Sequence, residues 1–178
     1  MKRKIILNLA ISLDGYIADK KGGFDWIKGD GDHSNDTKKQ FDFPKFLNSV
    51  DTIVMGKNAY LDCPKETMID FKYKKIYVAT TKKLENKYEN VEFINGDICD
   101  KILDLKKKKG SDIWLFGGAI LTDFFIKADI VDEYIIGIIP IILGEGRPLF
   151  LENNPRLKLN LKECTIQEGI VILKYVRK

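Results

Sequence analysis

Residues 115–126 read LFGGAILTDFFI, and the two adjacent glycines in this stretch decide how the chain is interpreted. They separate an apolar run at 113–116 from a run at 119–128 whose apolar residues follow helical spacing. Glycine loses more backbone entropy on folding than any other residue, so a glycine pair is unfavourable inside either kind of element. The pair is therefore predicted to join a strand to a helix. The turn is either merely tight or lets a ligand lie against the backbone.

Segments typical of strands and of helices alternate along the rest of the chain. Strands are predicted at 4–12, 51–56, 74–81, 91–95, 112–116, 131–143, 157–167 and 169–178, and helices at 44–50, 97–109 and 119–128. Strands separated by helices favour a largely parallel sheet, because parallel neighbours need crossover connections. The last two strands are joined near residues 168–169 and are predicted to form an antiparallel hairpin. The fold class is therefore α/β with a mixed, mostly parallel central sheet.

Composition excludes several classes of function. The chain has 178 residues, 44% of them hydrophobic, which is enough for one domain with a buried core. The net charge of +4 is spread along the chain, and no basic stripe interleaves with aromatic residues, so no nucleic-acid partner is expected. No apolar stretch reaches the roughly 18–20 residues that cross a membrane.

The cysteines point to a reducing compartment. Cys63, Cys99 and Cys164 are odd in number and far apart, so they predict neither a disulfide framework nor a metal site. They are interpreted as reduced thiols in a cytoplasmic protein. The basic N-terminus is followed by an apolar run that Asn8 and Ser12 interrupt, so it is read as a first strand and not as a signal peptide.

Three predicted strands end in groups that suit phosphate. The strand at 51–56 ends in Gly56 and Lys57, and the strand at 74–81 ends in two threonines followed by Lys82. The glycine pair would present free backbone N–H groups at the positive end of a helix dipole. Ligands of open α/β sheets bind at this edge, outside the carboxyl ends of the strands. The junctions therefore favour a ligand with several phosphates, although each lysine alone could be an ordinary solvated side chain.

These segments together resemble a known family. The stretches AISLDGYIA (10–18), DTIVMGKNAY (51–60), IYVATTKK (76–83), IWLFGGAILTDFFI (113–126) and IIPIILGEGRPLF (138–150) are similar, in order and spacing, to the dihydrofolate reductase superfamily. The likeness is greatest to the reductase domain of the bifunctional riboflavin-biosynthesis deaminase-reductase and its stand-alone bacterial relatives. It covers nearly the whole chain, so residues 1–178 are expected to form one dihydrofolate reductase-like domain with three layers.

The resemblance implies NADPH as cofactor. Its pyrophosphate would lie on the glycine junction, its 2′-phosphate beside hydroxyl and basic groups, and its nicotinamide carboxamide against the first strands. The residues that match these positions are Gly117, Gly118, Ala119, Ile120 and Leu121 for the pyrophosphate, Thr80, Thr81 and Lys82 for the 2′-phosphate, and Ala10 and Ile17 for the carboxamide. Gly56 and Lys57, at the end of the strand at 51–56, also match cofactor-binding positions. The family also implies a cis peptide bond between the two glycines. Lys57 and Ala59 replace the family's usual arginine and threonine, which places the preference for NADPH over NADH in doubt.

The substrate side is less clearly marked. Asn8 and Trp26 match positions near the substrate pocket, and the segment 41–47 is expected to bound it. The proton donor of dihydrofolate reductases has no aligned counterpart here, and Asp30 and Asp32 are the candidates. That absence argues against folate reduction and for a reductase of a ribosyl-pyrimidine. Asp14 lies in the turn SLDG, where a structural hydrogen bond is at least as good an explanation as a role in proton transfer.

Two hypotheses of different classes follow. The first is an NADPH-dependent reductase of a small pyrimidine- or pterin-like substrate, and the second is a dinucleotide-binding sensor or interaction protein without turnover. The apolar run at 135–143 favours either a homodimer or a strand that is covered on both faces.

Overall fold

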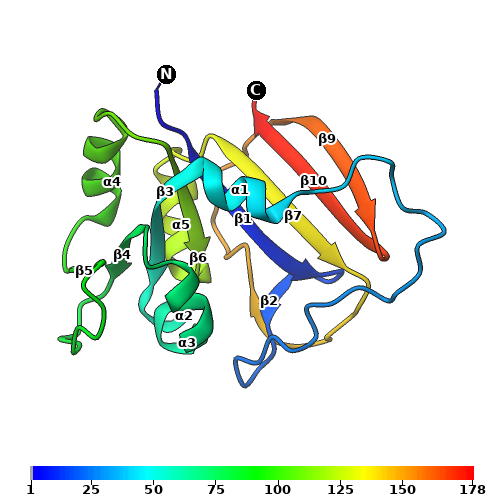
Figure 1. Ribbon diagram of the computed structural model, residues 1–178, viewed down its shortest axis with the longest axis horizontal. Helices are drawn as coiled ribbons and strands as arrows, with labels where there is room; N and C mark the ends of the chain where they lie inside the picture. The colour runs from blue at the N-terminus through cyan, green and yellow to red at the C-terminus, as the bar shows by residue number, and fades with distance from the viewer. Residues whose placement is uncertain (1) are drawn as a thin grey trace.

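The computed structural model describes residues 2–178 and shows a mixed central sheet (Figure 1). Its strand order is β5-β4-β3-β6-β1-β7-β10-β9. The neighbours from β5 through β7 pair in parallel, and β10 pairs antiparallel with β7 and β9. The strands are β1 (Ile5–Ser12), β3 (Val50–Gly56), β4 (Lys75–Ala79), β5 (Val91–Ile94), β6 (Asp112–Gly117), β7 (Glu133–Ile139), β9 (Leu159–Gln167) and β10 (Ile170–Arg177). The predicted fold class, with its C-terminal antiparallel hairpin, is confirmed.

Helices cover both faces of the sheet and make three layers (Figure 1). On one face lie α1 (Phe43–Ser49), α2 (Lys57–Asp62) and α3 (Lys65–Asp70), which bury Phe46, Tyr60 and Met68 in one core. On the other lie α4 (Ile98–Lys106) and α5 (Ala119–Lys127), which bury residues such as Ile102 and Phe125 in a second core. The sheet between these cores is apolar on both faces, as parallel strands require.

The strand β7 explains the apolar run that suggested a dimer. Ile135 packs in the core on the side of α1, and its neighbour Ile136 packs in the core on the side of α5. A strand buried on both faces needs no partner subunit to cover it. The homodimer therefore stays a prediction without this support.

Several short elements differ from the sequence prediction. The strand predicted at 131–143 ends at Ile139, because Pro140 has no N–H to continue the ladder. Beyond it, β8 (Arg147–Pro148) pairs with β2 (Tyr16–Ala18) in a separate small sheet. The helices α2 and α3 were not predicted, since each spans only six residues and periodicity is unreadable over so short a length.

The hairpin between β9 and β10 forms where the sequence predicted it. Glu168 (φ 50°) and Gly169 (φ 76°) are both left-handed, as a tight two-residue hairpin turn requires. An added Cβ at Gly169 would lie 2.3 Å from a carboxylate oxygen of Asp30, so a distant loop packs closely on this turn.

A buried carboxylate makes stability depend on pH. The Glu133 side chain is only 6% exposed and lies between the ammonium groups of Lys4 (2.5 Å) and Lys174 (3.0 Å). Burial alone would raise the pKa of Glu133, but the two lysines outweigh it and hold the pKa below its usual value. A lowered folded pKa means that the stabilisation is present above the unfolded pKa of about 4.3 and is lost as the pH falls through the folded pKa.

Glu133→Gln is therefore expected to flatten the loss of stability between about pH 5 and pH 3. Urea unfolding at several pH values measures this slope. Glu145→Gln is the control, because Glu145 forms an exposed ion pair with Lys20 that should contribute little. Equal slopes for wild type and Glu133→Gln would contradict the prediction.

Candidate active site

A cavity of about 1640 Å³ runs along the carboxyl ends of the parallel strands. At one end it is lined by the segments that follow β4 and β5, and in the middle by those that follow β3 and β6. At the other end β1, β7 and β10 line it on the side of α1. The cavity therefore crosses the sheet edge at which the sequence placed its candidate groups.

The glycine junction forms the middle of this cavity. Gly117 (φ 117°) and Gly118 (φ 75°) both have backbone angles that residues with a Cβ rarely adopt. An added Cβ at Gly56 would lie 3.5 Å from the carbonyl oxygen of Gly117, so the ends of β3 and β6 approach closely. The prediction of a cis bond between the two glycines is wrong, since no peptide bond within residues 2–178 is cis. The two left-handed glycines make the turn instead.

The helix α5 opens onto the cavity without a side-chain cap. Gly118 is its N-cap residue and has no side chain that could accept from the first turn. The backbone N–H groups of Ala119, Ile120 and Leu121 therefore precede the first intrahelical bond, which Thr122 donates to Gly118. Free N–H groups at the positive end of a helix dipole form a site suited to a phosphate.

The end beyond β4 carries hydroxyl and basic groups. Thr80, Thr81 and Lys82 line the cavity there, and Lys57 lines it beside the glycine junction. The buried Thr80 hydroxyl accepts from the backbone N–H of Lys82 (3.0 Å), so it shapes the turn. Thr81 and Lys82 remain exposed to the cavity. Asp97 begins the helix predicted at 97–109 and caps α4 by accepting from the N–H of Asp100 (3.0 Å). It also lines this end of the cavity, a position that sequence reasoning missed.

The first two strands supply the predicted residues at the opposite end. Ala10 and Asn8 on β1 and Ile17 on β2 all line the cavity. Asn8 is 8% exposed, and its backbone carbonyl accepts from the indole N–H of Trp114 (2.8 Å). Its side-chain nitrogen, Nδ2, is buried without a hydrogen-bond partner.

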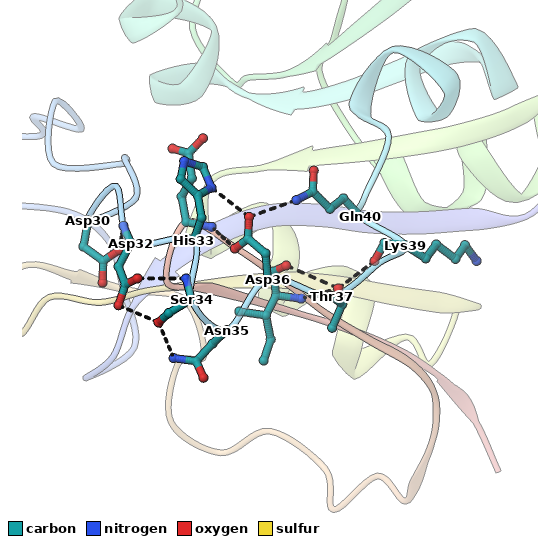
Figure 2. Close-up of polar contacts among 11 residues, drawn as sticks. Asp30, Asp32, His33, Ser34, Asn35, Asp36, Thr37, Lys39 and Gln40 are labelled. Atoms are coloured by element: carbon teal, nitrogen blue, oxygen red, sulfur yellow. Dashed lines mark hydrogen bonds and ion pairs between the residues drawn. The ribbon is translucent and has the colours of Figure 1, made fainter.

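Asp30 and Asp32 are not among the residues that line the cavity, and they hold the loop together instead (Figure 2). Asp32 accepts from the N–H (2.8 Å) and the hydroxyl (2.9 Å) of Ser34, and Asp30 accepts from the N–H of Asp32 (2.8 Å). The hydrogen bonds from Ser34 keep the pKa of Asp32 below its usual value. The predicted proton-donor role of Asp30 and Asp32 therefore gains no support.

Asp36 and Thr37 fix the same loop to the β9–β10 hairpin (Figure 2). Asp36 accepts from the N–H of Glu168 (2.7 Å) and pairs with His33 (2.9 Å), a contact that raises the pKa of His33 and lowers that of Asp36. Thr37 exchanges hydrogen bonds with the backbone of Ile166 (both 3.0 Å). The acidic loop is thus a structural element that ties residues 30–37 to the hairpin.

Trp26 and Asp14 also have structural contacts. The Trp26 ring is buried and donates to the carbonyl of Gly23 (3.1 Å), and it is not among the lining residues. Asp14 accepts from the hydroxyl of Ser12 (2.6 Å) and the backbone N–H of Gly144 (2.8 Å), in line with a turn-stabilising role. The Ser12 contact is the largest reason that the pKa of Asp14 is lowered.

Aromatic and apolar side chains line the end of the cavity near Asn8. Trp114 packs against Phe43 (5.8 Å between ring centroids) and Phe116 (5.0 Å). Other aromatic and apolar residues that line this side include Phe24, Ile27, Phe41, Ile170 and Ile172. Only the segment 41–47 was anticipated. The alternation of Trp114 and Phe116 on one face of β6 was a readable signal for the rest.

Within the described part of the chain, no group of three or more His, Cys, Asp or Glu side chains could hold a metal ion. Nor does any helix in residues 2–178 have the length and apolarity needed to cross a bilayer. Burial raises the pKa of the Cys63 and Cys99 thiols to about 11, so neither is an activated nucleophile.

Comparison with known proteins places the chain among reductase-type folds. The protein YwjB of Bacillus subtilis (strain 168) is 38% identical over 181 residues, which cover 99% of both chains. A crystal structure from Shewanella sp. PV-4, described as a riboflavin biosynthesis protein, matches with a TM-score of 0.77 and 31% identity, covering 98% of this chain and 99% of that one.

Two more distant structures share the fold. The diaminohydroxyphosphoribosylaminopyrimidine deaminase/5-amino-6-(5-phosphoribosylamino)uracil reductase of Thermotoga maritima matches with a TM-score of 0.71 and 17% identity, over 99% of this chain and 57% of that one. The dihydrofolate reductase of Enterococcus faecalis, complexed with NADP(H), matches with a TM-score of 0.62 and 16% identity, over 99% and 98%. The family model of the RibD C-terminal domain matches residues 3–172. The chain therefore belongs to the RibD C-terminal domain family.

Proposed function

We propose that this protein is an NADPH-dependent reductase of a small heterocyclic substrate, acting as one domain over residues 1–178. The observation that carries the proposal is the cavity itself. It joins an anion-binding glycine junction and two lysines to an aromatic-lined end, along one edge of the sheet. A dinucleotide has phosphates and a flat reactive ring in the same molecule. Its phosphates match the glycine junction and the lysines, and its ring matches the aromatic-lined end of the cavity.

The residues present fit this cofactor. The uncapped start of α5 and the missing Cβ atoms at Gly117 and Gly118 leave room and donors for a pyrophosphate. Lys57 and Lys82 supply cations for the other phosphate. When bound, NADPH supplies a hydride from its nicotinamide ring. The chain binds and orients the two reactants and excludes water from the buried end.

Protonation of the reduced substrate falls to water in this proposal. The carboxylates among the described lining residues are Asp62, which pairs with Arg147 (3.2 Å), and Asp97, which caps α4. Neither lies on β1, the strand that carries Asn8. A reductase of this design therefore needs a substrate whose reduction does not depend on a protein acid.

Fluorescence titration with NADPH and with NADH is the first test. Saturable binding of NADPH in the micromolar range, tighter than NADH, is the expected result. Oxidation of bound NADPH during a screen of pyrimidines and pterins then separates an enzyme from a dinucleotide-binding sensor. Failure of both nucleotides to bind would overturn the proposal.

A further inference from the structure

We infer that Arg147 binds a phosphate group of a ligand in the cavity, and that the carboxylate of Asp62 pairs with its guanidinium until this ligand arrives. The inference rests on the proposed function, because both residues line the cavity assigned there to the dinucleotide and its substrate. It adds to that function an arginine and a carboxylate that competes for it. The phosphate belongs either to the dinucleotide or to the substrate, and separate titrations distinguish these two sources.

The pair of Asp62 and Arg147 connects two separate parts of the cavity wall. Asp62 is the last residue of α2, the helix that follows β3. Arg147 begins β8 and pairs with Ala18 on β2, the strand that follows β1. The contact between Nη1 of Arg147 and Oδ2 of Asp62 (3.2 Å) is the one hydrogen bond or ion pair within residues 2–178 that joins α2 to the small sheet of β2 and β8. A change in this pair therefore affects both walls.

The guanidinium of Arg147 is held in a defined position. An added Cβ at Gly22 would lie 2.7 Å from Nη2, so the guanidinium lies directly on the backbone of this glycine, which also lines the cavity. The backbone beside Arg147 is equally close-packed, because an added Cβ at Gly146 would lie 2.4 Å from the carbonyl oxygen of Ala18. A side chain that is already positioned loses less conformational freedom when it binds a ligand.

Most donors of this guanidinium have no acceptor. Arginine carries a planar fork of N–H groups, and in the part of the chain that the structure describes only Nη1 has a partner, Asp62. The two side chains are 42% and 46% exposed, and exposed ion pairs contribute little to stability. A phosphate can accept two parallel hydrogen bonds from an arginine and carries more charge than a carboxylate. Exchange of Asp62 for a phosphate is therefore favourable.

Two variants separate this exchange from a merely structural ion pair. Arg147→Gln removes the cation that the phosphate would contact, so it should weaken binding. Asp62→Asn removes the competing carboxylate, so it should strengthen binding. If the pair only held the two walls of the cavity together, loss of either partner would change ligand affinity in the same direction.

Calorimetric titrations of wild type and both variants measure these effects in two arms. The first arm uses NADP⁺, and the second uses uridine 5′-monophosphate on protein saturated with NADP⁺. In one arm at least, Arg147→Gln is expected to lower affinity about tenfold, and Asp62→Asn to raise it about twofold to fivefold. A response to NADP⁺ assigns the phosphate to the dinucleotide, and a response in the second arm alone assigns it to the substrate. Changes in the same direction, or none in either arm, would overturn the inference.

A second ion pair provides the control for net charge. Lys20 and Glu145 form an exposed pair (2.9 Å) in the neighbouring loops, and neither residue lines the cavity. Lys20→Gln and Glu145→Gln make the same charge changes as the two test variants and are expected to leave both affinities unchanged. Effects as large as those of Arg147→Gln and Asp62→Asn would reduce the role of the tested pair to general electrostatics and overturn the inference.

Gly22→Ala tests the position of the guanidinium without changing any charge. Its added Cβ would displace the Arg147 head group, so affinity in the responding arm is expected to fall about fivefold. Gly15→Ala is the control for backbone strain, because Gly15 has nearly the same φ (90° against 91°) and an added Cβ there meets no atom within 4 Å. Equal affinities in Gly22→Ala and Gly15→Ala would contradict the role of Arg147. Failure of wild type to bind NADP⁺ or NADPH would instead refute the proposed function, and the inference with it.

Discussion

Gly118→Ala is expected to lower NADPH affinity by about a hundredfold or more, equivalent to roughly 2.7 kcal/mol of binding free energy. The added methyl group would point between Gly56 and Ala59, each 3.9 Å away, across the floor on which the pyrophosphate is placed. It would also force a residue with a Cβ into a backbone angle of φ 75°, ψ 135°. Such strain costs about 1–3 kcal/mol of folding stability and would displace the first N–H groups of α5.

The control separates backbone strain from loss of the site. Gly144 has nearly the same φ (76°), an added Cβ there meets no atom within 4 Å, and the residue does not line the cavity. Gly144→Ala should therefore lose some stability in urea unfolding and bind NADPH as wild type does. If both variants bind NADPH normally, the glycine junction is only a turn.

The same glycine pair shows how much of this protein could be predicted from its sequence. A Gly-Gly step between an apolar run and a helical run is a local signal, and the strand, turn and helix it predicted are all present. The hairpin at Glu168 and Gly169 is equally local. The candidate phosphate groups were correctly brought to one edge because parallel strands place their carboxyl ends together.

The structural roles of the carboxylates in the acidic loop could not be predicted from a local sequence signal. Asp30 and Asp36 are fixed by contacts with Glu168, more than 130 residues along the chain. A single sequence contains no signal for such a pairing, so free carboxylates and structural ones look alike. The orphaned Asn8 amide was likewise invisible, because only packing around β1 shows that no partner reaches it.

Replacing Lys57 and Lys82 together with alanine is expected to weaken NADPH binding about a hundredfold while leaving NADH affinity nearly unchanged. Each charge-assisted contact to a phosphate contributes about 1.5–3 kcal/mol, and NADH lacks the 2′-phosphate that these lysines would contact. Because the interaction is largely electrostatic, the difference between wild type and the double variant should shrink as salt is raised.

Lys83→Ala is the matched control for that experiment. Lys83 is adjacent to Lys82 and is also exposed, but it does not line the cavity. It carries the same charge, so its removal changes the net charge of the surface by one unit without removing a cavity contact. Fluorescence titrations of both nucleotides at low and high salt measure the effect. An equal loss of NADPH and NADH affinity in the double variant would place the lysines at the pyrophosphate. A loss of NADPH affinity in Lys83→Ala as large as in the double variant would reduce the role of the two lysines to general surface charge.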